Sequence, residues 1–172
     1  MPQISVHRIG PNDGDDLRDL RLRSLRDAPE AFGQTVEDAS AREVQDWQQQ
    51  ARQASAGDRR AWFIAEDESG RPNGLVQGRR RLPEHLLIFS MWVDPELRRS
   101  GVGRQLIEAV EAWACTWGGR HSVLWVFGTN EPAIRFYRRL GFEVELDTPD
   151  AESGRTYGAL AMSRRIVPPE RG

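Results

Sequence analysis

The stretch SMWVDPELRRSGVGRQLIEAVEAWACTW, residues 90–117, decides how the surrounding chain is interpreted. Its apolar start predicts a strand that ends at Asp94-Pro95, and its second half predicts an amphipathic helix over about 101–117. In the loop between them, Gly101 and Gly103 permit positive φ and a close approach of the backbone to a bound group. A helix that begins on such a loop offers unpaired N–H groups and the positive end of its dipole, which favour phosphate. The stretch therefore predicts an anion-binding loop between a strand and a helix.

The flanking sequence predicts a mixed α/β fold. The expected helices cover 13–26, 41–54, 101–117 and about 131–140, and the expected strands cover 4–9, 61–66, 73–81, 85–93, 122–127, 142–146 and 156–167. This β-α-α-β-β-β-α-β-α-β-β order indicates a central mixed, mostly antiparallel twisted sheet of about seven strands, flanked by about four helices. We expect one domain over residues 1–172, with 168–172 as a frayed tail.

Composition excludes several function classes. The net charge of −2 gives no reason to expect a nucleic-acid partner, and no apolar run approaches the roughly 20 residues that span a bilayer. The N-terminus lacks the basic-then-apolar pattern of a signal peptide, so a cytoplasmic protein without a membrane partner is expected. A single cysteine and three scattered histidines predict neither a disulfide nor a metal site. The 172 residues contain no lysine, which excludes Schiff-base chemistry.

Two phosphate-binding loops of other kinds do not fit the stretch. A dinucleotide fingerprint needs a third glycine at position 106, where the chain has Leu106. A Walker A loop needs a lysine, and all 24 basic residues are arginine.

Two motifs together identify the remaining possibility. The first is V-x-P-x-x-R-x-x-G-x-G over 93–103, and the second is NEPAIRFYRRLGF over 130–142. The second is similar to the segment N-x-x-A-x-x-F-Y-x-x-x-G-F, and both resemble motifs of the GCN5-related N-acetyltransferase (GNAT) superfamily. The order of strands and helices also agrees with that fold. The resemblance implies an acetyl-CoA-dependent enzyme that transfers an acetyl group to a primary amine.

The resemblance also implies where the cofactor binds. The coenzyme A (CoA) pyrophosphate would lie on the loop and the pantetheine arm along the strand end and the second motif, which together involve Met91, Trp92, Val93, Arg98, Arg99, Ser100, Gly101, Val102, Gly103, Arg104, Asn130, Ala133, Phe136 and Tyr137. The Val93 N–H would polarise the thioester carbonyl. Tyr137 would be the catalytic residue, the general acid that protonates the departing thiolate. The Trp92 side chain itself is expected in the core.

The general base and the acceptor stay open. The strand over 85–93 holds no carboxylate, so the candidates are Glu84, His85, Glu30 or a water held by Ser90 and backbone carbonyls. Phe32, Glu30 and Ser90 are the candidate acceptor-binding residues, and the hairpin after Arg155 resembles a segment that shapes the acceptor pocket. Arg79-Arg80-Arg81 is interpreted as a solvated edge. The acceptor could be a small-molecule, peptide or protein amine, with the chain a monomer or homodimer. The alternative function is a non-catalytic acyl-CoA-binding sensor or interaction module.

Overall fold

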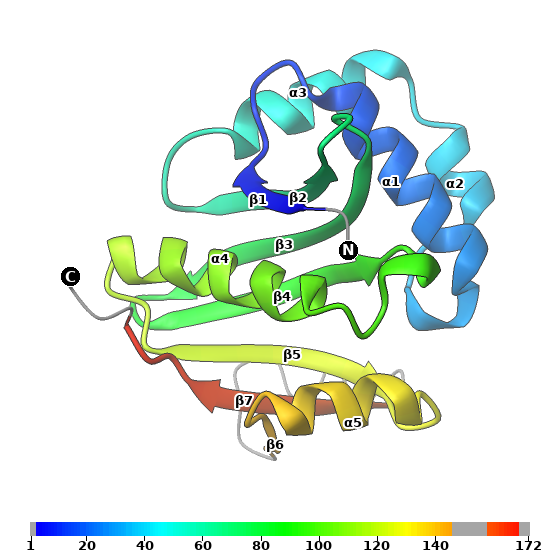
Figure 1. Cartoon of the computed structure of the whole chain (residues 1–172). Helices are drawn as coiled ribbons and strands as arrows, with labels where there is room; N and C mark the ends of the chain where they lie inside the picture. The colour runs from blue at the N-terminus through cyan, green and yellow to red at the C-terminus, as the bar shows by residue number, and fades with distance from the viewer. Residues whose placement is uncertain (1–2, 146–157, 169–172) are drawn as a thin grey trace.

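The computed structural model describes residues 3–145 and 158–168, which form one mixed sheet with helices on both faces (Figure 1). The strands are β1 (Ile4–Arg8), β2 (Arg60–Asp67), β3 (Pro72–Leu82), β4 (His85–Val93), β5 (His121–Phe127), β6 (Glu143–Val144) and β7 (Ala159–Arg165). The helices are α1 (Gly14–Asp27), α2 (Val36–Ser40), α3 (Val44–Ala54), α4 (Val102–Thr116) and α5 (Glu131–Arg139), with short 3₁₀ turns at η1 (Pro29–Ala31) and η2 (Pro95–Leu97). The predicted mixed α/β fold is confirmed.

The seven strands follow the order β1-β2-β3-β4-β5-β7-β6. All neighbouring pairs are antiparallel except β4 and β5, which run parallel because α4 crosses over between them. The parallel pair lies at the middle of the sheet, and because the two strands run in the same direction, the C-terminal ends of β4 and β5 lie at the same edge of the sheet. This arrangement places the loop before α4 at the C-terminal end of β4.

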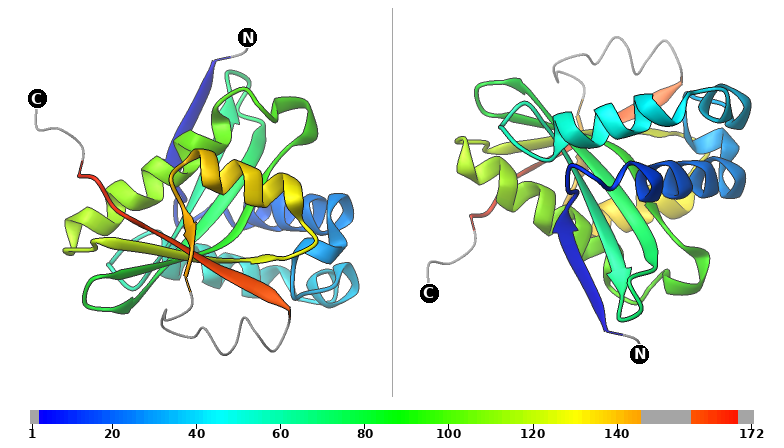
Figure 2. Two further views of the ribbon diagram at one scale, coloured as in Figure 1. Left: turned by 90° about the horizontal axis from the view of Figure 1, so that it is seen from below. Right: turned by 90° about the horizontal axis from the view of Figure 1, so that it is seen from above.

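Two hydrophobic layers cover the sheet. On one face α4 and α5 pack against β2–β5 and β7 through a cluster that includes Leu106, Ile107 and Val110 (Figure 2). On the other face α1 and α3 bury Leu20 and Trp47 against β2 and β3. Alternate residues of each strand therefore belong to opposite layers, which fixes the side on which each candidate site residue lies.

One glycine allows α4 to approach the sheet closely. A Cβ built on Gly78 would lie 2.4 Å from Val110 Cγ2 and 2.9 Å from Leu86 Cδ1. Contacts under 3.0 Å are not tolerated, so a side chain at this position would push the helix away from β3.

The structure differs from the expected boundaries mainly around the second helix and at Phe142. The helix expected over about 41–54 is α3, which begins later, at Val44. A separate helix α2 was not expected; it begins where Thr35 Oγ1 accepts a hydrogen bond from the Asp38 N–H at 3.1 Å. The chain therefore has five α-helices rather than about four. Phe142 is buried in the core outside the two-residue β6. The end of the expected 142–146 strand and the start of the expected 156–167 strand fall on residues 146–157, outside the described residues.

Among the described residues, no helix combines the length and apolarity that a membrane span requires.

Candidate functional site

The site begins where β4 and β5 separate. Their parallel pairing runs from His85↔His121 to Ile88↔Leu124 and then stops, although both strands continue (Figure 1). The separation coincides with a bulge in β4, because Leu75 pairs with Trp92 whereas Gln77 pairs with Phe89. Ser90, within the bulge, has φ of +53°, an uncommon value for a residue other than glycine. The bulge leaves the edge of β4 that faces β5 without a partner strand over its last residues.

The backbone alternation of β4 directs specific groups into this opening. The Asp94 N–H bonds to the Asn73 carbonyl at 2.8 Å, so it points toward β3. Successive residues of a strand point their N–H groups to opposite sides, and the Val93 N–H therefore faces the side from which β5 has diverged. This is the orientation that the predicted polarising role of Val93 requires.

The loop at 98–103 follows directly and presents unpaired donors. Gly101 has φ of +95° and Arg99 has φ of +67°, so the backbone turns sharply before α4 begins at Val102. Within the described part of the chain, the N–H groups of Arg99 and of residues 101–104 have no acceptor outside the loop or helix itself. Since Arg99 and Arg104 are exposed, the loop combines positive charge with a fan of free N–H groups at a helix N-terminus.

Arg98 has a different position from its neighbours. Its Nε donates to the Val93 carbonyl at 3.1 Å, and its Nη2 contacts Asp27 Oδ2. Trp92 Nε1 donates to the same Asp27 oxygen at 2.9 Å. The Arg98 side chain therefore braces the strand end against the C-terminus of α1, and the Trp92 side chain is buried in the α1–α3 layer as expected.

The loop meets α5 through a glycine contact. A Cβ built on Gly103 would lie 3.0 Å from Phe136 Cζ and 3.3 Å from Met91 Cε. The first turn of α4, the bulged part of β4 and the middle of α5 thus come together on the face that α4 and α5 cover.

Asn130, the first residue of the 130–142 motif, caps the N-terminus of α5. Asn130 Oδ1 accepts from the Ala133 N–H at 3.3 Å and caps the helix, while its amide Nδ2 has no partner among the described residues. Ala133 is half-buried one turn before Tyr137. The amide group of Asn130 is therefore the part of the side chain that remains available to a ligand.

Tyr137 is 8% exposed and lies between the Phe136 and Phe142 rings, with centroids 5.1 Å and 5.7 Å away. Its hydroxyl makes no hydrogen bond to a described residue. Desolvation by burial raises the pKa of the Tyr137 phenol well above its usual range. The phenol is therefore protonated across the physiological pH range and has a proton to donate.

The candidate base and acceptor residues are dispersed. Glu84 and His85 lie at the start of β4, and Glu84 pairs with Arg120 at 3.2 Å. His85 is five residue steps from Ser90 along the strand, which places it roughly 17 Å from the bulge. Glu30 is exposed in η1, whereas Phe32 is half-buried under the Arg21 guanidinium at 4.8 Å. Of these residues only Ser90 lies in the opening itself.

Four residues that the sequence interpretation did not place at the site meet beside the opening, on the face opposite α4. They are Gln77 and Arg79 on β3, Phe89 on β4 and Trp125 on β5. Phe89 and Trp125 are the first residues after the last β4–β5 pair, and their rings stack at 5.9 Å. Their meeting depends on strand register, and the only local signal is the alternation of Gln77 and Arg79.

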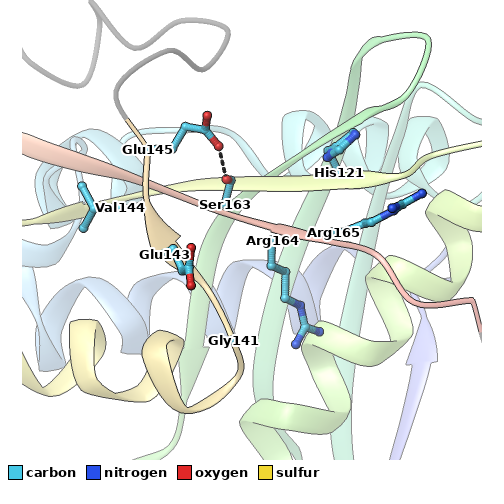
Figure 3. A pocket seen from close by; sticks show the side chains of 8 residues that line it. All are labelled: His121, Gly141, Glu143, Val144, Glu145, Ser163, Arg164 and Arg165. Carbon is cyan, nitrogen blue, oxygen red and sulfur yellow. Dashed lines mark hydrogen bonds between the residues drawn. The ribbon is translucent and has the colours of Figure 1, made fainter.

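A separate pocket of about 410 Å³ lies at the other end of β5 (Figure 3). Its lining residues are His121, Gly141, Glu143, Val144, Glu145, Ser163, Arg164 and Arg165. Arg164 donates to Glu111 on α4 at 2.9 Å and 2.5 Å, and the Ser163 hydroxyl bonds to Glu145. Arg164, Ser163 and Glu145 are therefore already paired, and the pocket lies away from the opening. Among the described residues, no three His, Cys, Asp or Glu side chains are grouped to hold a metal ion.

Comparison with known proteins agrees with this geometry. The chain is 34% identical over 147 residues to a mycothiol acetyltransferase of Propionibacterium freudenreichii, which covers 82% of this chain and 43% of that protein. It is 36% identical over 122 residues to an uncharacterised N-acetyltransferase of Methanocaldococcus jannaschii, which covers 61% and 49% of the two chains. This chain thus spans less than half the length of these relatives.

The fold also matches solved structures. The PaiA N-acetyltransferase of Thermoplasma acidophilum in complex with coenzyme A superposes with a TM-score of 0.75 at 16% identity, covering 95% of this chain and 99% of that one. At this identity the match establishes the fold alone. The model of the acetyltransferase (GNAT) family matches residues 17–142, which is well over half of the chain and includes both motifs. The chain belongs to the acetyltransferase (GNAT) family.

Proposed function

We propose that this chain is an acetyl-CoA-dependent N-acetyltransferase that acetylates a primary amine. One observation supports the proposal above the others: β4 and β5 separate after Ile88 and Leu124, directly beside a loop of unpaired N–H groups. A β-sheet loses hydrogen bonds by such a separation, so an extended ligand that inserts between the strands would restore them. The family uses acetyl-CoA, whose amide-containing arm and phosphates match these two features.

The residues present fit that donor. The N–H groups of Arg99 and 101–104 would hold the pyrophosphate, with the Arg99 and Arg104 side chains adding charge. The backbone of Met91 and Val93 and the free amide of Asn130 would hold the pantetheine arm. When bound, acetyl-CoA supplies an acetyl group already activated as a thioester. Arg98 contacts the Val93 carbonyl and Asp27 and so orients the strand end beside the cofactor, where it stays a candidate contact.

Tyr137 is the proton donor in this proposal. Its hydroxyl lacks a partner among the described residues and its burial keeps it protonated. In this proposal the phenol donates its proton to the sulfur as the carbon–sulfur bond breaks, which yields the free thiol of CoA. The Val93 N–H, which faces the opening, stabilises negative charge on the reacting oxygen.

Removal of a proton from the attacking amine is assigned to water. β4 carries no carboxylate, and Glu84 and His85 lie at its far end. Ser90, half-buried in the bulge, is the residue that could hold such a water at the opening. Phe32 and Glu30 precede α2 and are retained as candidate contacts of the acceptor.

Binding and turnover test the proposal in separate steps. Acetyl-CoA at 100 times its Kd would stabilise the folded chain by about 2.7 kcal/mol, which a thermal-shift series detects. A panel of amines is then tested for acetyl-CoA-dependent release of free thiol. Absence of both stabilisation and thiol release would contradict the proposal, whereas stabilisation without release by any amine would favour the acyl-CoA sensor.

A further inference from the structure

A cluster of four side chains flanks the opening on the face opposite α4 and α5. Leu124 and Val126 belong to the α4–α5 layer, so Trp125, between them, points to the other face. Gln77 shares that face with Leu75, which belongs to the α1–α3 layer. The donor-binding elements Gly103, Phe136 and Tyr137 lie on the α4–α5 side. The cluster is therefore placed where an acceptor would approach from the side opposite the donor.

The arginine of this cluster is held in a defined orientation. Arg79 Nε donates to Gln77 Oε1 at 2.8 Å, and its guanidinium lies 4.7 Å from the centre of the Phe89 ring. Phe89 in turn stacks on Trp125. Among the described residues no carboxylate pairs with Arg79, and its cross-strand partner on β2 is the like-charged Arg60. The Nη groups of Arg79 make no hydrogen bond to a described residue, and they are open to solvent because the residue is exposed.

The cluster also contains buried donors that make no hydrogen bond. Gln77 is 1% exposed, and its Nε2 has no partner, as is also true of Trp125 Nε1. A buried polar group without a partner costs about 1–3 kcal/mol, and an apolar side chain at position 77 would avoid that cost. Gln77 is therefore poorly explained by stability alone, but it is explained by its hydrogen bond to Arg79.

We propose that Arg79, oriented by Gln77 and supported by the Phe89–Trp125 stack, binds a carboxylate of the acceptor, so that the acceptor is an amino acid or another amine that carries a carboxylate. This inference rests on the proposed N-acetyltransferase function. The Arg79 Nε–H is taken by Gln77, and the remaining edge, formed by the two Nη groups, matches a carboxylate in a bidentate arrangement. The aromatic pair provides the apolar surface beside it for the remainder of the acceptor. The residue is exposed, but desolvation of the guanidinium against its neighbours, and then the like charge of Arg60, lower the pKa of Arg79, which is the direction expected of a cation that lacks a counter-ion.

The test compares acids with their uncharged analogues. Thiol release from acetyl-CoA is measured with the twenty amino acids and the matched amino-acid amides, with kcat/KM expressed per unprotonated amine. Loss of one charged hydrogen-bonding partner weakens binding by roughly 10- to 100-fold. The kcat/KM of each acid is therefore expected to exceed that of its amide by about that factor. Arg79→Gln should abolish the preference mainly through KM, and Arg79→Lys should restore part of it. Arg80→Gln is the matched control, because Arg80 lies on the opposite face and pairs with Asp58.

A binding measurement accompanies the kinetics. N-acetylated amino acids should stabilise the wild-type chain in the presence of CoA more than their amides do, and Arg79→Gln should remove that difference. Gln77→Leu separates positioning from packing: we expect a raised KM for the acids, with unchanged kcat and undiminished thermal stability. If amides and acids react equally and Arg79→Gln changes neither KM nor the stabilisation, the carboxylate inference is wrong while the acetyltransferase proposal stands. If no amine releases thiol and acetyl-CoA does not stabilise the chain, both are wrong.

Discussion

Replacement of Gly101 by alanine tests whether the loop before α4 binds the phosphates of acetyl-CoA. Gly101 precedes α4 with φ of +95°, and no atom lies within 4 Å of a Cβ built there. The expected effect of alanine is therefore backbone strain without steric conflict, about 1–2 kcal/mol for an L-residue in the left-handed region. Because the position is exposed, the variant loop can relax in the free protein, and the strained conformation must be re-formed when phosphate binds. We expect the Kd for acetyl-CoA to rise by roughly 5- to 30-fold.

The same helix provides the matched control. Gly118 follows the C-terminus of α4 with φ of +86° and is likewise open around its Cβ position. Gly118→Ala should lower the free energy of unfolding by no more than the ~1–2 kcal/mol of strain expected for alanine at a positive φ. It should leave the Kd for acetyl-CoA unchanged within about twofold. Titration calorimetry with acetyl-CoA gives the Kd, and urea unfolding gives the stability. An unchanged Kd in Gly101→Ala, or equal weakening in both variants, would refute the assignment of phosphate binding to this loop.

Three further substitutions test other parts of the account. Tyr137→Phe should lower turnover by about 10²-fold or more and leave the Kd for acetyl-CoA nearly unchanged. Since burial raises the pKa of the phenol, a loss of kcat/KM from its deprotonation should begin only above pH 10; the pH profile checks this sign. Glu111→Gln breaks the buried ion pair with Arg164 on β7 and should lower the free energy of unfolding, measured in urea, by about 3–5 kcal/mol. Its control is Glu108→Gln on the exposed side of α4, which should lower it by less than about 1 kcal/mol. Gly78→Ala should cost about 1–3 kcal/mol by overpacking against α4, and Gly33→Ala, where a Cβ meets nothing within 4 Å, should change stability by less than about 0.5 kcal/mol.

Local signals in the sequence predicted the central part of the fold. The helix over 101–117 was predicted within one residue of α4 at each end, because glycines mark both of its ends and an apolar stripe defines its face. The helix in the second motif was predicted equally well, since Asn130 and Pro132 are strong start signals. Helix α2 was not predicted, although Thr35 and Asp38 form an N-cap signal that could have located its start.

Features that depend on long-range contacts could not be predicted. The position of β7 between β5 and β6 is a matter of tertiary pairing, which no local period encodes. Arg98 is predicted to contact the cofactor, and no local signal indicated that its guanidinium contacts Asp27, 71 residues earlier in the chain. Arg79 was interpreted as a solvated edge residue, and the structure agrees in that Arg79 is exposed. The sequence did not indicate its hydrogen bond to Gln77 or its contact with Phe89, because the latter depends on the register of β3 with β4.

The central claim is that the donor binds in the opening between β4 and β5 with its pyrophosphate on the loop before α4. Backbone amide chemical shifts, followed by NMR during titration with acetyl-CoA, test this claim most directly. The largest changes are expected at Arg99, residues 101–104 and residues 91–93, with little change at Gly118 at the far end of α4. Saturating acetyl-CoA that leaves the 99–104 and 91–93 amides unmoved, or that shifts only residues around the Glu143–Ser163 pocket, would contradict the account.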